Sequence, residues 1–423
     1  MKYFQRLLLS IVIIFSLVQC SNSPSQKEIE QTEQIEQSEE TAQIRILDEV
    51  PQDIKETENL TVFSGDTEPA NSIELIPEQT FGKSGEPYLT QVQNCVVDDK
   101  DRVIILNSGS NYAQQVYVYN EDGTFHTAIG RSGNGPGEYG YVLGMRAQPG
   151  KILIRDVRNK RFNIYNSTDY SLERTMLIER LEIRDHKAVE GLEFGMMNPR
   201  NDGNYLVSFY QQVSETGWPV AKYLLMDSDG AALDYNILEF RRSFKAQGKT
   251  ESMSAPMSLK PMPFMGSTVT GISDEGELYS VWNHDFLIKK YDAKGNYQSA
   301  IYYPVKGSPF DLSSHTPTPF YDQSDVMKAI DIHDEELPEA NPIIDRLMVD
   351  DENRIWVAVP TGGQSDSYEW WILEESGKLL AKLTLPGEQE IYDIKNGYLY
   401  SKKTKEETGI EYVVKYRIAL TKK

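Results

Sequence analysis

The sequence predicts an all-β protein: a six-bladed β-propeller of four-stranded antiparallel blades, with the last blade closed by an N-terminal strand. Three observations support this prediction. Strand-sized apolar runs recur along the chain, turn-forming residues separate them in two interleaved series, and an early strand without a blade matches a strand missing from the last blade. At 423 residues, 39% of them hydrophobic, the chain is long and apolar enough to bury a large core.

Six apolar runs follow turn residues such as DDKD, QPGK and SDEG, at a spacing of about 45 to 75 residues. Runs of strand length at such periods are typical of propeller blades rather than of helical solenoids. Each run would be the second strand of a blade, after a tight turn from the inner strand. The runs begin near Val103, Ile152, Tyr205, Leu278, Ile355 and Tyr398.

A second series of turns, NEDGT, NSTDYS, DSDGA, DAKGN and EESGK, interleaves with the first. Asp, Asn and Gly suit tight hairpins because they tolerate positive φ at low cost. In each blade this second turn would connect a third strand, such as QVYVYN or WWILE, to the outer strand.

The last blade is incomplete when it is read from the C-terminus alone. Six sets of three strands are present, but only five outer strands follow them, because the set QEIYDI, GYLYSKK and EYVVKYRIAL ends with the chain. The segment IELIPEQTF near Ile73 has no blade of its own. We therefore expect Ile73 and its neighbours to pair with the strand around Val413, which closes the ring and removes exposed strand edges.

Residues 1–19 have the features of a signal peptide, with a basic start before an apolar run from Leu7 to Val18. A run of about a dozen residues is short of the roughly 20 that a membrane-spanning helix needs. The stretch LVQC resembles a bacterial lipoprotein signal, which implies that Cys20 is lipidated. Gln19 departs from the small residue usual before that cysteine, and the alternative is an ordinary secretory signal with a chance cysteine.

Residues 20–58 are rich in Glu, Gln, Ser and Thr and show no strand alternation, which predicts a flexible tether. Residues 59–423 would form the propeller. The net charge of -21 lacks the basic footprint that nucleic-acid binding needs, so that class of partner is excluded. Cys95 is the one cysteine after Cys20, so no internal disulfide is expected, and its apolar setting CVV predicts a buried side chain.

A family resemblance follows from these residues. The lipoprotein-like signal, the DxxGxIYV-type runs, the DG turns and the stretch IGRSGNGPGEY together resemble the six-bladed β-propeller lipoproteins of Bacteroidetes-type bacteria, which are related to NHL-repeat propellers. The resemblance covers residues from about 60 to 420, although blades three to five lack any GPGE. It implies a location in the cell envelope, as an outer-membrane lipoprotein anchored through Cys20.

One face of such a propeller carries the middle loop of each blade and the connections between blades; we call it the upper face. The two series of tight hairpins lie on the opposite, lower face. The long segments fall on the upper face, among them the decapeptide GRSGNGPGEY (Gly130–Tyr139), with its echo GKSGEPY from Gly82, and the insertions 241–266 and 304–342. Long loops on a rigid scaffold are where binding usually resides, so we expect the functional face there.

The decapeptide has two readings. It could contact a ligand through Arg131 or Tyr139, or it could be a turn between blades in which Glu138 bonds to backbone amides and Arg131 pairs locally. No GK[ST] and no helix follow it, so it is not a phosphate-binding P-loop. The other candidate binding residues on upper loops or rims are Arg155, Asp156, Arg158, Trp218, Trp282, His284 and Tyr368.

These further candidates also have two readings each. The arginines and the aspartate could bind an anionic group in bidentate fashion or form a salt network between blades. The aromatic residues could stack on a sugar ring or an apolar partner, or they could belong to the core. His284 could be a base or a metal ligand, but the five histidines have no ligand spacing, so no metal site is predicted. The insertion around Tyr321 to Glu336 predicts a short helix.

No catalytic triad, paired-carboxylate signature or cofactor fingerprint is present in the sequence, so no cofactor and no catalytic residue is assigned. The first hypothesis is a membrane-anchored envelope lipoprotein whose upper face binds a protein, peptide or glycan. The alternative is a metal-dependent lactonase- or lyase-like hydrolase with a site in the central channel. A purely structural envelope component is a third possibility.

Overall fold

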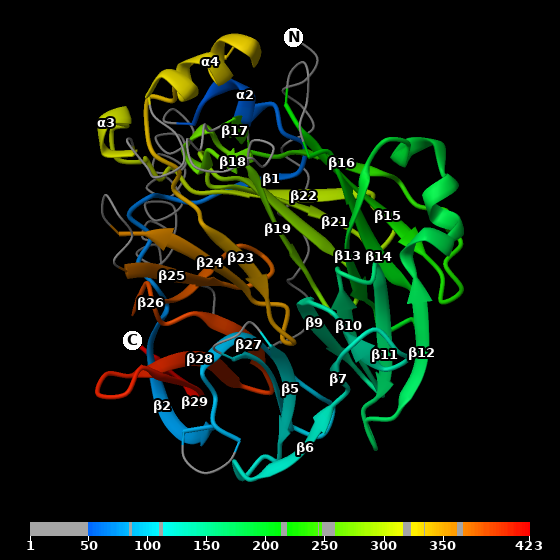
Figure 1. The fold of residues 1–423 in the computed structure, drawn as a ribbon. Coiled ribbons are helices and arrows are strands. Elements are labelled where there is room, and N and C mark those ends of the chain that lie inside the picture. The colour runs from blue at the N-terminus through cyan, green and yellow to red at the C-terminus, as the bar shows by residue number, and fades with distance from the viewer. Residues whose placement is uncertain are drawn as a thin grey trace, which may run out of the picture. The chain divides into compact units, whose positions relative to one another are not determined.

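Six sheets, each with four antiparallel strands and one with an added fifth strand, surround a common centre in the computed structural model (Figure 1). The structure describes residues 50–83, 87–109, 113–212, 218–243, 245–247, 259–315, 323–333, 335–361 and 367–423. The signal peptide, Cys20 and the tether up to residue 49 lie outside the described residues, so these predictions stay untested. The six-bladed propeller itself is confirmed.

In blades one to five the strands run from the inner to the outer strand in chain order, and in blade six the outer strand comes from the start of the described chain. Blades one to three are β3 (Gln91–Val97), β4 (Val103–Ser108), β5 (Gln114–Tyr119) and β6 (Phe125–Ile129); β9 (Val142–Gln148), β10 (Lys151–Asp156), β11 (Arg161–Asn166) and β12 (Leu172–Leu177); and β13 (Glu193–Pro199), β14 (Tyr205–Tyr210), β15 (Val220–Met226) and β16 (Leu238–Arg241). Blades four to six are β19 (Thr268–Ile272), β20 (Leu278–Trp282), β21 (Leu287–Tyr291) and β22 (Tyr297–Tyr302); β23 (Arg346–Val349), β24 (Ile355–Pro360), β25 (Ser367–Leu373) and β26 (Leu379–Pro386); and β27 (Ile391–Lys395), β28 (Tyr398–Lys405), β29 (Ile410–Lys422) and β2 (Asn71–Phe81).

Both predicted series of hairpin turns are present, and each turn contains a residue with positive φ, as tight hairpins require. The turns between inner and second strands have this conformation at Asp101, Gly150, Gly203, Gly276, Asn353 and Gly397. The turns between third and outer strands have it at Gly123, Tyr170, Gly230, Gly295 and Gly377. The acidic DDKD and DDEN segments stabilise such turns, since Asp98 and Asp350 each accept two backbone N–H groups and one arginine.

The ring closes as predicted. β2 pairs in antiparallel register with β29, from Ile73 opposite Leu420 to Phe81 opposite Val413. In Figure 1 the blue β2 runs beside the red β29, so strands from the two ends of the chain share blade six.

A further strand, β1 (Leu60–Val62), was not predicted. It lies parallel to β22 and adds a fifth, outermost strand to blade four, after the single-turn helix α2 (Gln52–Lys55). The chain then crosses blade five, where the Ala70 amide donates to the Leu379 carbonyl at 3.2 Å, and enters β2. Residues 60–81, which we call the strap, therefore contact three consecutive blades.

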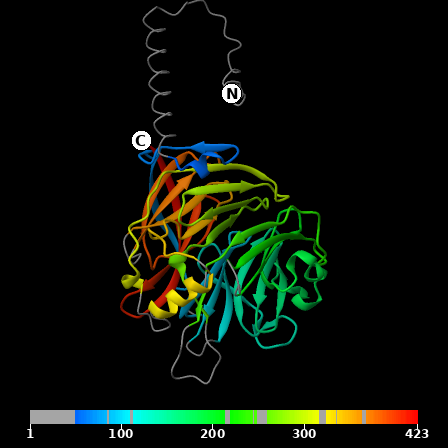
Figure 2. The same cartoon turned by 90° about the horizontal axis from the view of Figure 1, so that it is seen from above.

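The insertions pack beside the blades as small clusters (Figure 2). After β12, the 3₁₀ turns η1 (Ile178–Arg180), η2 (Glu182–Asp185) and η3 (Lys187–Val189) reach a lower-face hairpin, since the Ile183 amide donates to the Gly230 carbonyl at 2.8 Å. The predicted short helix is confirmed as α4 (Gln323–His333), which packs with the turn η4 (Pro263–Met265) and lies near the helix α3 (Leu312–His315). The hairpin β17 (Lys245–Gln247) and β18 (Leu259–Pro261) belongs to the same insertions, and β7 (Arg131–Ser132) pairs with β8 (Glu138–Tyr139) inside the decapeptide.

The core lies between facing blades rather than in one central cluster, because each sheet is buried on both faces by its neighbours. Cys95 is buried as predicted, and burial raises the pKa of its thiol well above its usual value. Among the described residues, no helix has both the length and the apolar character needed to span a bilayer.

Candidate functional site

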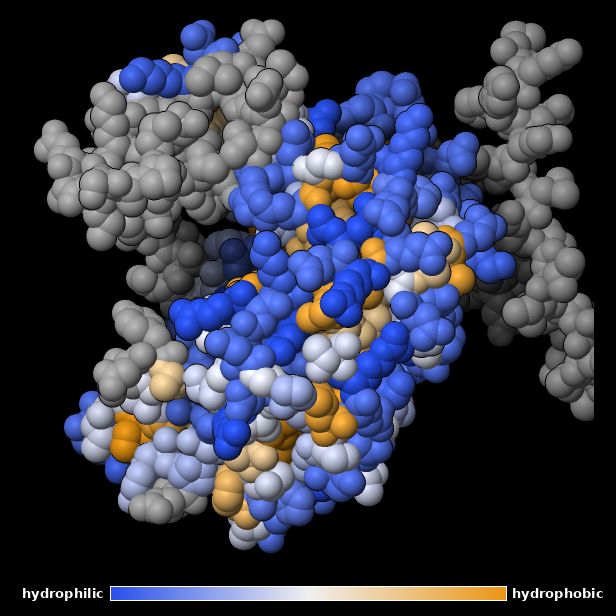
Figure 3. Space-filling view, turned by 45° about the vertical axis from the view of Figure 1, so that its right-hand side comes forward, coloured by the Kyte–Doolittle hydropathy of each residue, from blue (hydrophilic) through white to orange (hydrophobic). Residues whose placement is uncertain are grey.

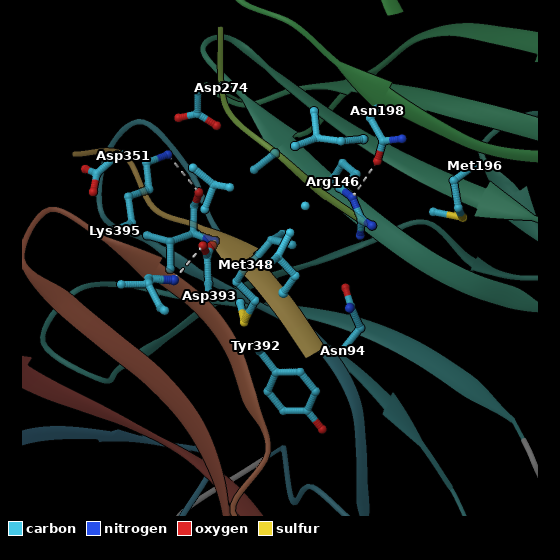
Figure 4. A pocket seen from close by; sticks show the side chains of 18 of the residues that line it. Asn94, Arg146, Met196, Asn198, Asp274, Met348, Asp351, Tyr392, Asp393 and Lys395 are labelled. Atoms are coloured by element: carbon cyan, nitrogen blue, oxygen red, sulfur yellow. Dashed lines mark hydrogen bonds between the residues drawn. The ribbon is translucent and has the colours of Figure 1, made fainter. Parts of the chain in front are cut away.

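A cavity of about 400 Å³ occupies the central channel. All six inner strands contribute to its wall, mostly through their C-terminal halves, together with Asp274 and Asp351 from two hairpin turns (Figure 4). The cavity therefore lies toward the lower face. It is in the size range of small-ligand sites, and its wall combines apolar residues with several charged ones.

Arg146 on β9 brings a guanidinium group to this cavity. Its Nε donates to Asn198 Oδ1 at 3.3 Å and its Nη1 to the Met145 carbonyl at 2.9 Å. Burial lowers the pKa of Arg146, and the negative charge of Asp393 offsets part of this effect. Within the described part of the chain, Arg146 forms no ion pair, in contrast to Arg102 and Arg161, each of which has a carboxylate within 3.2 Å.

Asp393 on β27 faces the same cavity from blade six. Its Oδ2 accepts the Val97 amide at 2.9 Å and its Oδ1 accepts the Ile394 amide at 2.9 Å. Burial raises the pKa of Asp393 to about 6, against the opposing effects of the Val97 hydrogen bond and the Lys395 charge. Both carboxylate oxygens are thus held by backbone groups, yet each retains a lone pair for a further donor.

The open end of the cavity carries further charges. Asp274 and Asp351 are exposed in the hairpins of blades four and five, and Lys395 donates from Nζ to the Val97 carbonyl at 3.2 Å. In Figure 4, Arg146 lies on one side of the cavity, and Asp393, Lys395 and Asp351 lie on the other. None of these charged side chains forms an ion pair within the described residues.

Sequence reasoning missed the channel residues because it regarded the lower face as plain. A usable signal exists in the inner strands, which are otherwise uncharged except for Glu193 and Arg346 at the first positions of β13 and β23. VLGMRAQ contains Arg146 within the strand, and IYDIK contains Asp393 and Lys395. A charge inside an inner strand of a propeller has only the channel or a neighbouring blade as its surroundings. Only the folded ring shows that these charges share one cavity.

The decapeptide is bound tightly to blade two. Arg131 pairs with Glu138 at 2.7 Å, and Glu138 accepts the Gly135 amide at 2.8 Å, which lowers the pKa of Glu138. Tyr139 is buried; its hydroxyl donates to the Ile129 carbonyl and accepts the Val116 amide, both at 3.1 Å. This geometry matches the structural reading of the decapeptide as a turn between blades.

Asp156 anchors the same loop from β10. Its buried carboxylate accepts the amides of Gly140 and Tyr141 and pairs with Arg161 at 3.2 Å. Arg161 in turn donates to three carbonyl groups of the decapeptide. Asp156 is therefore fully occupied by internal partners.

Arg155 and Arg158 diverge from Asp156. Arg155 is buried and crosses to blade three, where its Nη2 donates to the Phe194 carbonyl at 3.0 Å; burial lowers its pKa. Arg158 is exposed, with its aliphatic stem over Gly140. The three residues thus do not converge on one anion site.

Trp218, Trp282 and His284 do come together. The two indole rings pack edge to face with centroids 5.1 Å apart, and the His284 ring lies 6.1 Å from Trp282. Trp218 donates from Nε1 to Glu335 at 2.6 Å, and His284 Nε2 lies 3.1 Å from the Phe264 carbonyl. Burial lowers the pKa of His284. These contacts join the insertions to blades three and four.

Tyr368 lies apart from that group, in blade five, with the Arg346 guanidinium 5.9 Å from its ring centroid. Across the described ranges, no three His, Cys, Asp or Glu side chains lie together as a metal site would require. The structure thus brings together three of the nine predicted binding residues, and none of the nine lines the cavity in the central channel.

Comparisons with known proteins agree with this architecture. Residues 83–190 match a protein family described as "6-bladed beta-propeller". No functionally curated protein matches the chain significantly. A Bacteroides fragilis protein described as exported superposes with a TM-score of 0.50 at 14% identity, covering 86% of this chain and all of its own.

A Bacteroides vulgatus protein that belongs to a family of unknown function superposes with the same TM-score at 11% identity, covering 83% of this chain and all of its own. At these identities the likeness establishes the fold alone. The protein is a six-bladed β-propeller whose solved structural neighbours include Bacteroides proteins.

Proposed function

We propose that this protein is a binding lipoprotein of the bacterial envelope, anchored to the outer membrane through lipidated Cys20, whose propeller holds a small anionic ligand in the central channel. The observation that carries the proposal is Arg146, whose guanidinium faces a cavity of about 400 Å³ and has no carboxylate partner among the residues that the structure describes. A partly desolvated cation of this kind is unfavourable until an anion binds it, so ligand binding recovers free energy.

Other features support this role. The lipoprotein-like signal and the exported description of the Bacteroides fragilis neighbour agree with an envelope location. On the face seen in Figure 3, hydrophobic side chains are scattered among polar ones, which suits a small polar ligand better than a large apolar partner. The hydrolase alternative would need a cluster of metal ligands in the channel, and the described carboxylates there do not form one.

The test uses the full-length protein in detergent. Saturation-transfer NMR against a panel of small carboxylates, amino acids, dipeptides and sugar acids should identify at least one ligand, and Arg146→Met should abolish its binding. Arg174→Met, which alters an exposed arginine paired with Asp229, is the matched control and should bind normally. If no panel member bound, or if binding survived Arg146→Met, the proposal would be wrong.

A second binding role is favoured by a specific surface feature. Tyr141, just before β9, and Leu143, near its upper end, are 37% and 55% exposed, and the exposed Arg158 lies over the adjacent Gly140. An apolar pair next to a cation could receive a protein or glycan partner on the upper face. Replacing Tyr141 and Leu143 by serine should then reduce partner capture from envelope extracts, whereas Arg146→Met should not.

A further inference from the structure

We infer that the channel site selects a zwitterion: an α-amino acid or a short peptide with free ends, whose carboxylate binds Arg146 and whose ammonium group binds the acidic wall at Asp393. This inference rests on the proposed function, because it names the class of ligand for the same cavity. It adds a requirement for a positive charge on the ligand, which Arg146 alone does not imply.

The arrangement of charges carries the inference. Arg146 comes from blade two, Asp393 from blade six and Asp274 from blade four, and no two of them form an ion pair. Opposite charges that share a partly buried cavity normally pair, because separated charges lose solvation without compensation. Here the scaffold holds them apart across the space that a ligand would occupy.

The hydrogen bonds explain why the side chains do not collapse together. Asn198 and the Met145 carbonyl hold the Arg146 guanidinium, while the backbone amides of Val97 and Ile394 hold the Asp393 carboxylate. Among the described residues, no hydrogen bond engages Arg146 Nη2, and each Asp393 oxygen accepts only one. Such a fixed pair of opposite charges is preorganised for a ligand with complementary charges at its two ends.

The cavity wall carries more acidic than basic side chains. The three aspartates outnumber Arg146 and Lys395, and Lys395 is already engaged by the Val97 carbonyl. A purely anionic ligand would therefore meet repulsion opposite Arg146, and a purely cationic ligand would meet Arg146 itself. Apolar side chains from the inner strands, including Leu347 and Ile272, provide a surface for an uncharged side chain of the ligand.

The test compares matched ligands by calorimetry on the full-length protein in detergent. The probes are the standard L-amino acids, glycylglycine and triglycine, each with its N-acetylated form, which lacks the ammonium group, and its C-terminal amide, which lacks the carboxylate. At least one zwitterion should bind, and each of its two modified forms should bind at least tenfold more weakly.

The variants assign each end of the ligand. Arg146→Met should remove the preference for the free carboxylate, and Asp393→Asn should remove the preference for the free ammonium. Asp274→Asn tests the acidic wall separately if the Asp393 variant folds poorly, and Asp229→Asn on the outer surface should change nothing. If the N-acetylated form bound as tightly as the zwitterion, the inference would fail while the proposed function survived. If no ligand with a free carboxylate bound, both would fail.

Discussion

Two contrasting kinds of charged side chain lie in the interior of this protein. Asp98, Asp156 and Asp350 are fully hydrogen-bonded and each neutralises an arginine, so they stabilise turns and loops. Arg146 and Asp393 share a cavity without pairing. A side chain of the first kind contributes to folding, whereas one of the second kind lowers stability and is retained where binding needs it.

The stability of the protein should depend on pH because the charged form of Asp393 is unfavourable when buried. Burial raises its pKa from 3.8 to about 6, so between these values the folded protein holds a proton that the unfolded chain has released. The contribution of Asp393 to stability is therefore greatest at low pH and is lost as the pH rises through 6. As the pH rises from 4 to 7, the difference in unfolding free energy between Asp393→Asn and wild type should therefore shift by about 2 to 3 kcal/mol in favour of the variant.

Urea unfolding of both proteins at several pH values measures this difference. The titratable or charged groups around Asp393 are Arg146, Lys395, Asp274, Asp351, Cys95 and Tyr392. Asp122→Asn is the control. Hydrogen bonds from Thr124 lower the pKa of Asp122, so the difference in unfolding free energy between this variant and wild type should change with pH in the opposite direction. If the difference in unfolding free energy between Asp393→Asn and wild type did not change with pH, the prediction would be wrong.

Asp156→Ala should be among the most damaging substitutions at a single polar residue. It would leave the buried Arg161 without its carboxylate and two loop amides without an acceptor, at a cost of about 3 to 5 kcal/mol. The exposed Asp229 also pairs with an arginine, so Asp229→Ala is the matched control and should change stability by less than about 0.5 kcal/mol. Thermal unfolding monitored by circular dichroism distinguishes the two outcomes.

At the scale of elements, the turns determine where each strand ends. The decapeptide needs glycine at position 130, where φ is 60° and an added Cβ would lie 2.5 Å from the Gly137 carbonyl oxygen. Gly150 also has positive φ, at 82°, but an added Cβ there would meet nothing within 4 Å. Alanine at position 150 would therefore have only the cost of the left-handed backbone, whereas alanine at position 130 would add a steric clash.

Alanine substitution at these two glycines tests the role of the decapeptide. Gly150→Ala should cost about 1 kcal/mol from the left-handed conformation alone. Gly130→Ala should cost at least 2 kcal/mol more, because the contact with Gly137 requires the loop to move. Equal losses in urea unfolding would show that the loop adapts freely and is not tightly held by blade two.

At the scale of the whole molecule, the strap joins three blades and closes the ring. β2 covers a long edge of β29, while β1 adds only three residues to the outside of blade four. Closure removes the exposed edges that would otherwise pair with other chains. Loss of β2 should therefore reduce stability much more than loss of β1.

Truncation from the N-terminus should show this difference. A chain starting at Phe63 loses β1 but keeps the closed ring, so it should keep the oligomeric state of the full-length protein with a modest loss of thermal stability. A chain starting at Gly82 also loses β2, which exposes the edge of β29, and it should aggregate or fail to unfold cooperatively. Size-exclusion chromatography and calorimetry would contradict this view if both truncated chains behaved alike.

The sequence alone was sufficient for the fold because the features that specify a propeller are local. Turn residues such as Gly123 and Asn353 and the apolar runs that follow them identify the strands, and counting strands is enough to place Ile73 beside β29. The short β1 was missed because a three-residue edge strand has no periodic signal. The local pairing of Arg131 with Glu138 was also foreseen as one reading of the decapeptide.

The channel site could not be foreseen in the same way. Arg146 and Asp393 are 247 residues apart in the sequence, and each lies in a short strand with few other charges. Their juxtaposition depends on how far each blade is rotated around the ring and which way each side chain leaves its strand. The sequence determined the ring and its closure through local patterning, whereas only the tertiary structure decided which charges share the channel, because that depends on long-range packing.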